Sequence, residues 1–197
     1  MATYFDTLKT PYQDVQITDD GISTSDFIVA TEGLVKMFHL LGNSAFVVVQ
    51  NDMNGNIKKI RERFLATGPD TSGTLQLLVQ NEGKPGEKKR VATEGLLWLL
   101  RGLDLTAKAL RRSLENPSEE LSASFTNAYE NSLRQHHGIM LAMKACPYRN
   151  DFVAKLGSPP DRVDAQMRDW LAALERIVAD MQSFYECAVK GNYAKGM

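Results

Sequence analysis

The 197-residue chain is poor in the features that mark several large classes of protein. It has two cysteines, Cys146 and Cys187, which are too few for a disulfide framework or a cysteine metal cluster. We therefore expect reduced thiols in a cytoplasmic protein. No stretch approaches 18 uninterrupted apolar residues, so the sequence predicts no membrane-spanning helix. The first 15 residues contain no basic segment followed by an apolar run, so we expect no signal peptide.

Neither positive nor negative charge is in excess, since the formal net charge is -1. Such a balance predicts no nucleic-acid partner and no general attraction to an anionic membrane. The three histidines lack the Glu-x-x-His spacing of a metal site in a helical bundle, so we expect no metal. Paired catalytic carboxylates and nucleophile motifs are missing too, which predicts a protein that is not an enzyme, has no catalytic residues and needs no cofactor.

Apolar residues at helical spacing are what the sequence does have. The chain shows no confident strand, no internal repeat and short connections. We predict an all-α fold of six to eight helices, which fits either a two-layer helical sandwich or a bundle with a ligand cavity. It is formed by one domain (residues 1–197) after an extended lead-in (residues 1–22). The expected helices cover residues 23–41, 45–65, 74–82, 91–115, 118–146, 150–157 and 163–189.

Three polar residues border the apolar stripe of the second expected helix, in the stretch "NDMNGNIKKI". At about 100° per residue, Asp52, Asn56 and Lys59 fall in a sector roughly 60° wide. One interpretation is a set of solvated residues at a core boundary. The other is a hydrogen-bonding patch for a hydroxyl-rich ligand, because a carboxylate, an amide and an ammonium supply both acceptors and donors. Gly55 would then let a backbone or ligand approach closely.

A tryptophan lies in one of the most apolar segments of the chain, in "TEGLLWLLRGL". Trp98 is either a core residue, as most tryptophans in such a setting are, or a platform on which a sugar ring stacks. Arg101 is a candidate for a structural ion pair. Glu94, one turn before Trp98, could pair with Arg101 or accept from a ligand hydroxyl.

Four ordered motifs resemble the glycolipid transfer protein family. Residues 52–59 resemble its D-x-x-x-N-x-x-K helix, and residues 98–103 its W-L-x-R-G-L helix. Residues 128–138 resemble its A-Y-E followed by H-G, and "CPYRNDF" (residues 146–152) completes the set. Together they cover the chain from about residue 23 to residue 193, so the resemblance is far more specific than any one motif.

The resemblance implies an all-α, two-layer sandwich of about eight helices enclosing an apolar pocket for lipid chains. It also implies that this fold binds one glycosphingolipid of the glucosyl-, galactosyl- or lactosylceramide type. It implies that Asp52, Asn56 and Lys59 contact the sugar and that Trp98 stacks on the first sugar ring. It also implies that His137 contacts the ceramide carbonyl, that Asp52 takes the ceramide amide N–H, and that Tyr193 lies near the headgroup. The implied protein is a monomer that touches membrane surfaces transiently, as a cytoplasmic, peripheral carrier.

A sister branch that carries ceramide-1-phosphate has basic residues at the positions of Asn56 and Trp98, because a phosphate needs cations. Here both positions are uncharged, so we expect neutral sugars. The sequence departs from the family where Ile139 follows the H-G pair and where the run after it is short, in the region that lines the lipid tunnel. A non-transferring glycolipid sensor or presenter on the same fold is the alternative function.

Overall fold

The computed structural model describes residues 2–42, 45–84, 89–132 and 146–188, and these ranges hold eight α-helices and three short 3₁₀ helices. The α-helices are α1 (Thr24–Met37), α2 (Ala45–Thr67), α3 (Pro69–Ser72), α4 (Leu75–Glu82), α5 (Val91–Glu115), α6 (Leu121–Ser132), α8 (Arg149–Leu156) and α9 (Pro160–Ala188). The 3₁₀ helices are η1 (Phe5–Thr7), η2 (Tyr12–Asp14) and η3 (Phe38–Leu41). The prediction of an all-α fold with about eight helices is confirmed.

Local signals in the sequence set several helix ends. The Ser23 hydroxyl caps α1 by accepting from the Asp26 N–H at 3.4 Å, and the Thr74 hydroxyl caps α4 by accepting from the Leu77 N–H at 3.2 Å. Gly42 ends η3 in the left-handed region, with φ of 68°, a conformation that suits glycine. The β-branched run before Gln50 is helical, as its apolar period predicted.

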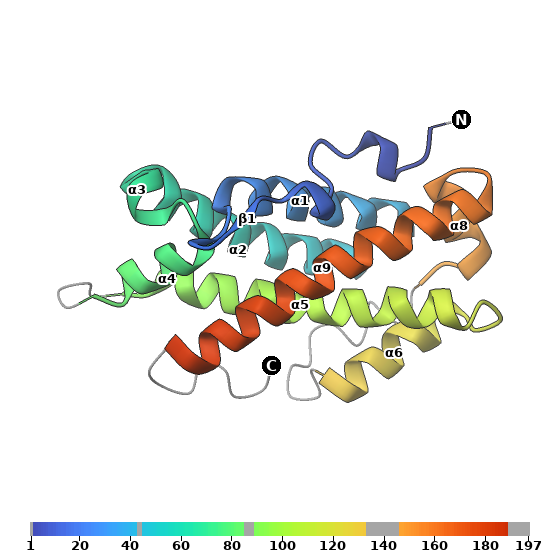
Figure 1. Ribbon diagram of the computed structural model, residues 1–197. Helices are drawn as coiled ribbons and strands as arrows, with labels where there is room; N and C mark the ends of the chain where they lie inside the picture. The colour runs from blue at the N-terminus through green and yellow to red at the C-terminus, as the bar shows by residue number, and fades with distance from the viewer. Residues whose placement is uncertain (1, 43–44, 85–88, 133–145, 189–197) are drawn as a thin grey trace.

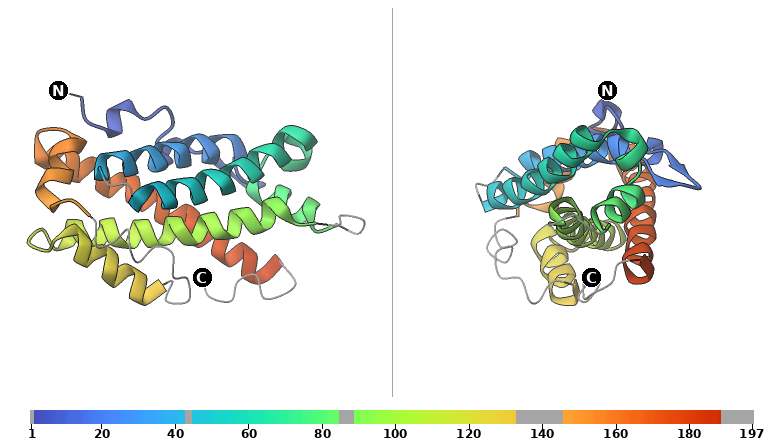
Figure 2. Two further views of the ribbon diagram at one scale, coloured as in Figure 1. Left: turned by 180° about the vertical axis from the view of Figure 1, so that it is seen from behind. Right: turned by 90° about the vertical axis from the view of Figure 1, so that its left-hand side faces the viewer.

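The helices form two layers around an apolar core (Figure 1). In the end-on view, α1 to α3 lie on one side and α4 to α6 on the other, while α9 runs along the flank and joins them (Figure 2). The central helix is α5, which packs against α2, α6 and α9. Among the described residues, no helix is long and apolar enough to cross a membrane.

The lead-in is more structured than predicted. Besides η1 and η2, it forms a short antiparallel hairpin of β1 (Ile17–Thr18) and β2 (Gly21–Ile22), so the expectation of an extended segment without strands was wrong. Tyr12 is 1 % exposed and lies against Trp170 of α9, with ring centroids 5.2 Å apart. Burial against α9 supplies the order that local sequence signals did not indicate.

Two other helix predictions differ from the structure. Residues 69–72, expected as a break, form the single helical turn α3, which begins with proline at its first position. The helix expected over residues 118–146 begins at Leu121 and is described as far as Ser132. Residues 133–145 lie outside the described residues.

Candidate functional site

The three polar residues on α2 touch one another in a row. The Lys59 ammonium donates to the Asn56 side-chain oxygen at 2.9 Å, and the Asn56 amide donates to the Asp52 carboxylate at 3.5 Å. Asn56 is 3 % exposed, whereas Asp52 and Lys59 are exposed. A buried amide held between two exposed charges has a fixed orientation, so the row offers an acceptor and a donor of set geometry at the surface. The solvated-surface interpretation therefore fails for Asn56.

The spacing between α2 and α5 is set by a glycine on α5. A Cβ atom at Gly95 would lie 2.9 Å from Cδ of Lys59 and 3.5 Å from the backbone oxygen of Asn56. Gly102, two turns along α5, is nearest to Met53, so the two helices run antiparallel. Gly55 does not have the predicted role in helix contact, because no described atom lies within 4 Å of its missing side chain. The close approach occurs at Gly95, which the sequence analysis missed.

Trp98 is not a core residue, since 41 % of it is exposed. The guanidinium of Arg101 lies over its ring, 4.6 Å from the ring centroid, in a cation–π contact. Partial burial lowers the pKa of Arg101 from its usual value, but the group stays charged. The core tryptophan is Trp170, which is fully buried. Trp98 is thus a partly exposed indole in contact with Arg101, on the helix that packs against α2.

The start of α5 is held by a buried carboxylate that the sequence analysis also missed. Glu82, at the end of α4, is 4 % exposed and accepts from the Ala92 N–H at 3.1 Å and from the Thr93 N–H and hydroxyl at 2.6 and 2.7 Å. The Thr93 carbonyl accepts from the buried Tyr185 hydroxyl of α9 at 2.8 Å. The first turn of α5, just before Gly95, is therefore fixed to α4 and α9.

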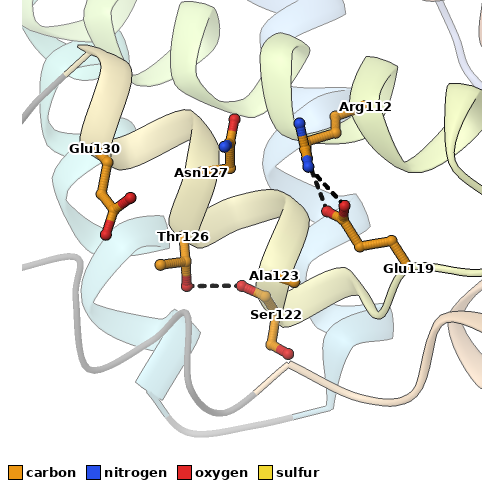
Figure 3. Close-up of a pocket in the computed structure, with 7 residues that line it drawn as sticks. All are labelled: Arg112, Glu119, Ser122, Ala123, Thr126, Asn127 and Glu130. Carbon is orange, nitrogen blue, oxygen red and sulfur yellow. Dashed lines mark hydrogen bonds and ion pairs between the residues drawn. The ribbon is translucent and has the colours of Figure 1, made fainter.

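Two hollows in the described part of the structure have walls that include none of the three polar residues on α2. The larger, about 530 Å³, is a shallow polar depression over α6 and the end of α5 (Figure 3). It is lined by Arg112, Glu119, Ser122, Ala123, Thr126, Asn127 and Glu130. The Arg112–Glu119 ion pair at 2.7 Å already satisfies its main charges, so the depression offers little to a ligand.

The smaller hollow, about 10 Å³, is buried and apolar. Its walls come from α1, η3, α5, α6 and α8, namely Leu34, Met37, Phe38, Leu41, Thr106, Leu110, Phe125 and Phe152. This volume holds about one water molecule. A hydrocarbon chain would enter this hollow only if its walls moved apart.

Comparison with known proteins decides the family. A family model described as "Glycolipid transfer protein (GLTP)" matches residues 22–158. A curated protein from Aureobasidium melanogenum named "Glycolipid transfer protein" is 50 % identical, over 93 % of this chain and 92 % of that protein. The chain belongs to the glycolipid transfer protein family.

Two solved structures of glycolipid transfer protein folds are similar to this one. The crystal structure of HET-C2, described as a fungal glycolipid transfer protein, has a TM-score of 0.88 and 42 % identity, covering 98 % of this chain and all of that one. The structure of FAPP2, described as selecting simple glycosphingolipids with this fold, has a TM-score of 0.83 and 30 % identity, covering 94 % and 95 %. The two-layer helical sandwich is thus the fold of the family.

Of the residues that the family resemblance singled out, the structure joins three: Asp52, Asn56 and Lys59 form the row on α2. Trp98 lies on the neighbouring helix α5, which packs against α2. His137 and Tyr193 lie outside the described residues. No group of histidine, cysteine or acidic residues in the described ranges is arranged to hold a metal ion.

Proposed function

We propose that this protein binds one glycosphingolipid and carries it between membranes without altering it chemically. The observation that carries the proposal is the row of Asp52, Asn56 and Lys59 beside the exposed, braced indole of Trp98. Family membership supports it, and the names of the fungal relatives favour transfer over a non-transferring sensor or presenter.

The polar row and the indole suit a sugar because they match its two kinds of surface. Sugar hydroxyls both donate and accept, and the row presents the Asp52 carboxylate as acceptor and the Lys59 ammonium as donor. The apolar C–H face of a sugar ring stacks on an aromatic ring, which Trp98 supplies. A lipid without the sugar would leave the buried Asn56 amide with only its present neighbours and would gain none of these contacts.

The lipid chains would lie in the apolar interior. Exposing hydrocarbon to water costs roughly 0.8 kcal/mol per CH₂ group, so a lipid leaves a membrane slowly on its own. A small apolar hollow lies among the described helices, next to Phe38, Leu110 and Phe152. No covalent bond changes in this process, so the protein acts as a carrier and needs no catalytic residue.

Further parts of the proposal rest on the family resemblance alone. They are the contact of His137 and Asp52 with the ceramide amide, a place for Tyr193 near the headgroup, and a cargo of glucosyl-, galactosyl- or lactosylceramide. A monomer that works in the cytoplasm and contacts membranes transiently completes the proposal.

Substitution of Asp52 by valine tests the headgroup site. We expect Asp52→Val to abolish transfer of galactosylceramide between phosphatidylcholine vesicles and to leave the helical circular dichroism unchanged, because Asp52 is exposed. Asp169→Val is the matched control, since Asp169 is an exposed aspartate on α9. Normal transfer by Asp52→Val, or an equal loss in the control, would contradict the assignment.

A further inference from the structure

Gly55 is an exposed glycine in the middle of α2, and the packing of the described residues does not explain it. Glycine is a poor residue for a helix interior, where alanine is favoured. It is retained where φ is positive, where another backbone approaches closely or where a ligand does. The φ of Gly55 is not positive, and a Cβ atom built there meets no described atom within 4 Å. The close approach of a ligand is the reason that remains.

Four exposed polar residues surround the position of the missing side chain. The nearest neighbours of a residue on a helix surface lie three and four positions away. For Gly55 these are Asn51 and Asp52, one turn before it, and Lys58 and Lys59, one turn after it. We call the bare helix backbone between these four exposed side chains the Gly55 gap.

The groups around the Gly55 gap suit a neutral, hydroxyl-rich ligand. The Asp52 carboxylate accepts hydrogen bonds, the Lys59 ammonium donates them, and the Asn51 amide does both. Lys58 lies 3.7 Å from the carboxylate of Glu62. The two ammonium groups are therefore balanced by two carboxylates, so the gap has no net charge that would favour an anion.

The Gly55 gap lies further from α5 than the polar row does. Asn56 is on the side of α2 that faces α5, because its backbone oxygen is 3.5 Å from a Cβ atom built at Gly95. Gly55 is about 100° away from Asn56 around the helix, on the exposed side. A ligand that lies between the two helices and continues outward over α2 therefore passes over the gap.

The gap is also at the level of Trp98 along the two helices. Gly95 adjoins Asn56, and Gly102, seven residues further along α5, adjoins Met53. Trp98 lies between these two glycines on α5, so it is opposite the segment of α2 that contains the gap. A headgroup that begins at this level on α5 reaches the gap without moving along α2.

We infer that the Gly55 gap receives the second sugar of a diglycosylceramide, which makes Gly55 a specificity-determining residue for the length of the headgroup. This inference rests on the proposed function, in which the first sugar lies between the polar row and Trp98. A side chain at position 55 fills the space of the second ring and leaves the residues of the polar row in place. Gly55 thus acts on lipids with two sugars more than on lipids with one.

Gly55→Ala tests whether the protein itself needs the glycine. Alanine adds one methyl group where no described atom is near and is the better helix former. We expect Gly55→Ala to raise Tm by about 2–4 °C in thermal unfolding. A lower Tm would show that the fold requires glycine at this position, and the inference would then be overturned.

Gly55→Leu tests the role in ligand binding, because leucine fills the gap. Its matched control is Ala66→Leu, since Ala66 is exposed on the same helix, within roughly 20° of Gly55 around the axis and about 16 Å further along it at ~1.5 Å per residue. Both variants add one exposed leucine to the same face of α2. A general effect of surface hydrophobicity would therefore change both alike.

The assay is competition within one membrane. Phosphatidylcholine vesicles contain glucosylceramide and lactosylceramide in equal amounts and with the same acyl chain, so the two lipids differ only in the second sugar. The two protein–lipid complexes are counted by native mass spectrometry. We expect Gly55→Leu to lower the ratio of bound lactosylceramide to bound glucosylceramide roughly tenfold, because the second ring meets the added side chain.

The outcomes separate the inference from the proposed function. A ratio that Gly55→Leu leaves unchanged, or that Ala66→Leu lowers equally, would overturn the role of Gly55 and leave glycolipid binding intact. Uptake of glucosylceramide without lactosylceramide by the unsubstituted protein would also overturn it. Failure of the unsubstituted protein to take up either lipid would instead overturn the proposed function.

Discussion

The two tryptophans allow the proposed ligand platform, Trp98, to be compared with a core residue, Trp170. A buried tryptophan covers roughly 150–250 Å². The three fifths of Trp98 that are covered thus correspond to about 120 Å², or ~3 kcal/mol as an upper limit at ~25 cal/mol per Å². Alanine is the better helix former by about 0.5 kcal/mol. We therefore expect Trp98→Ala to lower the free energy of unfolding by about 2 kcal/mol.

Trp170→Ala removes a fully buried side chain that touches Phe5 and Tyr12, and leaves a cavity. Such substitutions typically cost about 3–5 kcal/mol. For a protein of this size each kcal/mol lowers Tm by roughly 2–4 °C, so we expect decreases of about 4–8 °C for Trp98→Ala and about 6–20 °C for Trp170→Ala in thermal unfolding.

Fluorescence of the single-tryptophan variants measures the function of each residue. In Trp170→Phe, the remaining Trp98 is partly in water, and we expect galactosylceramide to shift its emission to shorter wavelength as the sugar displaces water from the ring. In Trp98→Phe, the buried Trp170 should not respond to the sugar. A response only from Trp170, or a larger Tm decrease for Trp98→Ala than for Trp170→Ala, would refute the platform role.

Two more predictions concern groups away from the indole. Glu82→Ala should lower the free energy of unfolding, measured by urea titration, by about 3 kcal/mol, because three buried donors on α5 lose their acceptor. The exposed Glu186→Ala is the control. A loss below about 1 kcal/mol in Glu82→Ala would contradict the role of Glu82. Burial raises the pKa of the Cys146 thiol to about 12, so at pH 8 only about one thiol in ten thousand is ionised. Iodoacetamide should therefore alkylate the exposed Cys187 first in the folded protein, and equal rates by mass spectrometry would argue against the burial of Cys146.

Much of the helical architecture follows from local sequence signals. The apolar period of α5 predicted its bounds of Val91 and Glu115, and the glycine at position 42 marked the end of η3. The lead-in was not predictable in the same way, because η1 and η2 are ordered by Phe5 and Tyr12 packing on a helix more than 150 residues away. Long-range burial of this kind leaves no periodic pattern in a short segment.

The sequence placed the three polar residues of α2 on one edge of a helix, but it did not give their geometry. Spacing placed Asp52, Asn56 and Lys59 on one edge of a helix, but only the packing of α2 on α5 shows that the amide is buried between two exposed charges. The importance of Gly95 depends on which helix faces it, and a single sequence does not give that pairing. Glu82 looked like an ordinary polar residue at a helix end, since its partners on α5 lie ten and eleven residues away across a loop.

The nearly filled hollow beside Leu110 and Phe152 has an energetic consequence for cargo. A hydrocarbon tail that enters there replaces contacts between protein side chains with contacts between side chains and tail. The gain on loading is then smaller than that of moving the same tail from water into oil. Because the hollow is nearly filled when no tail is present, its apolar walls stay out of water in the empty protein. Such an exchange keeps uptake and release near balance, which a shuttle requires and a storage protein does not.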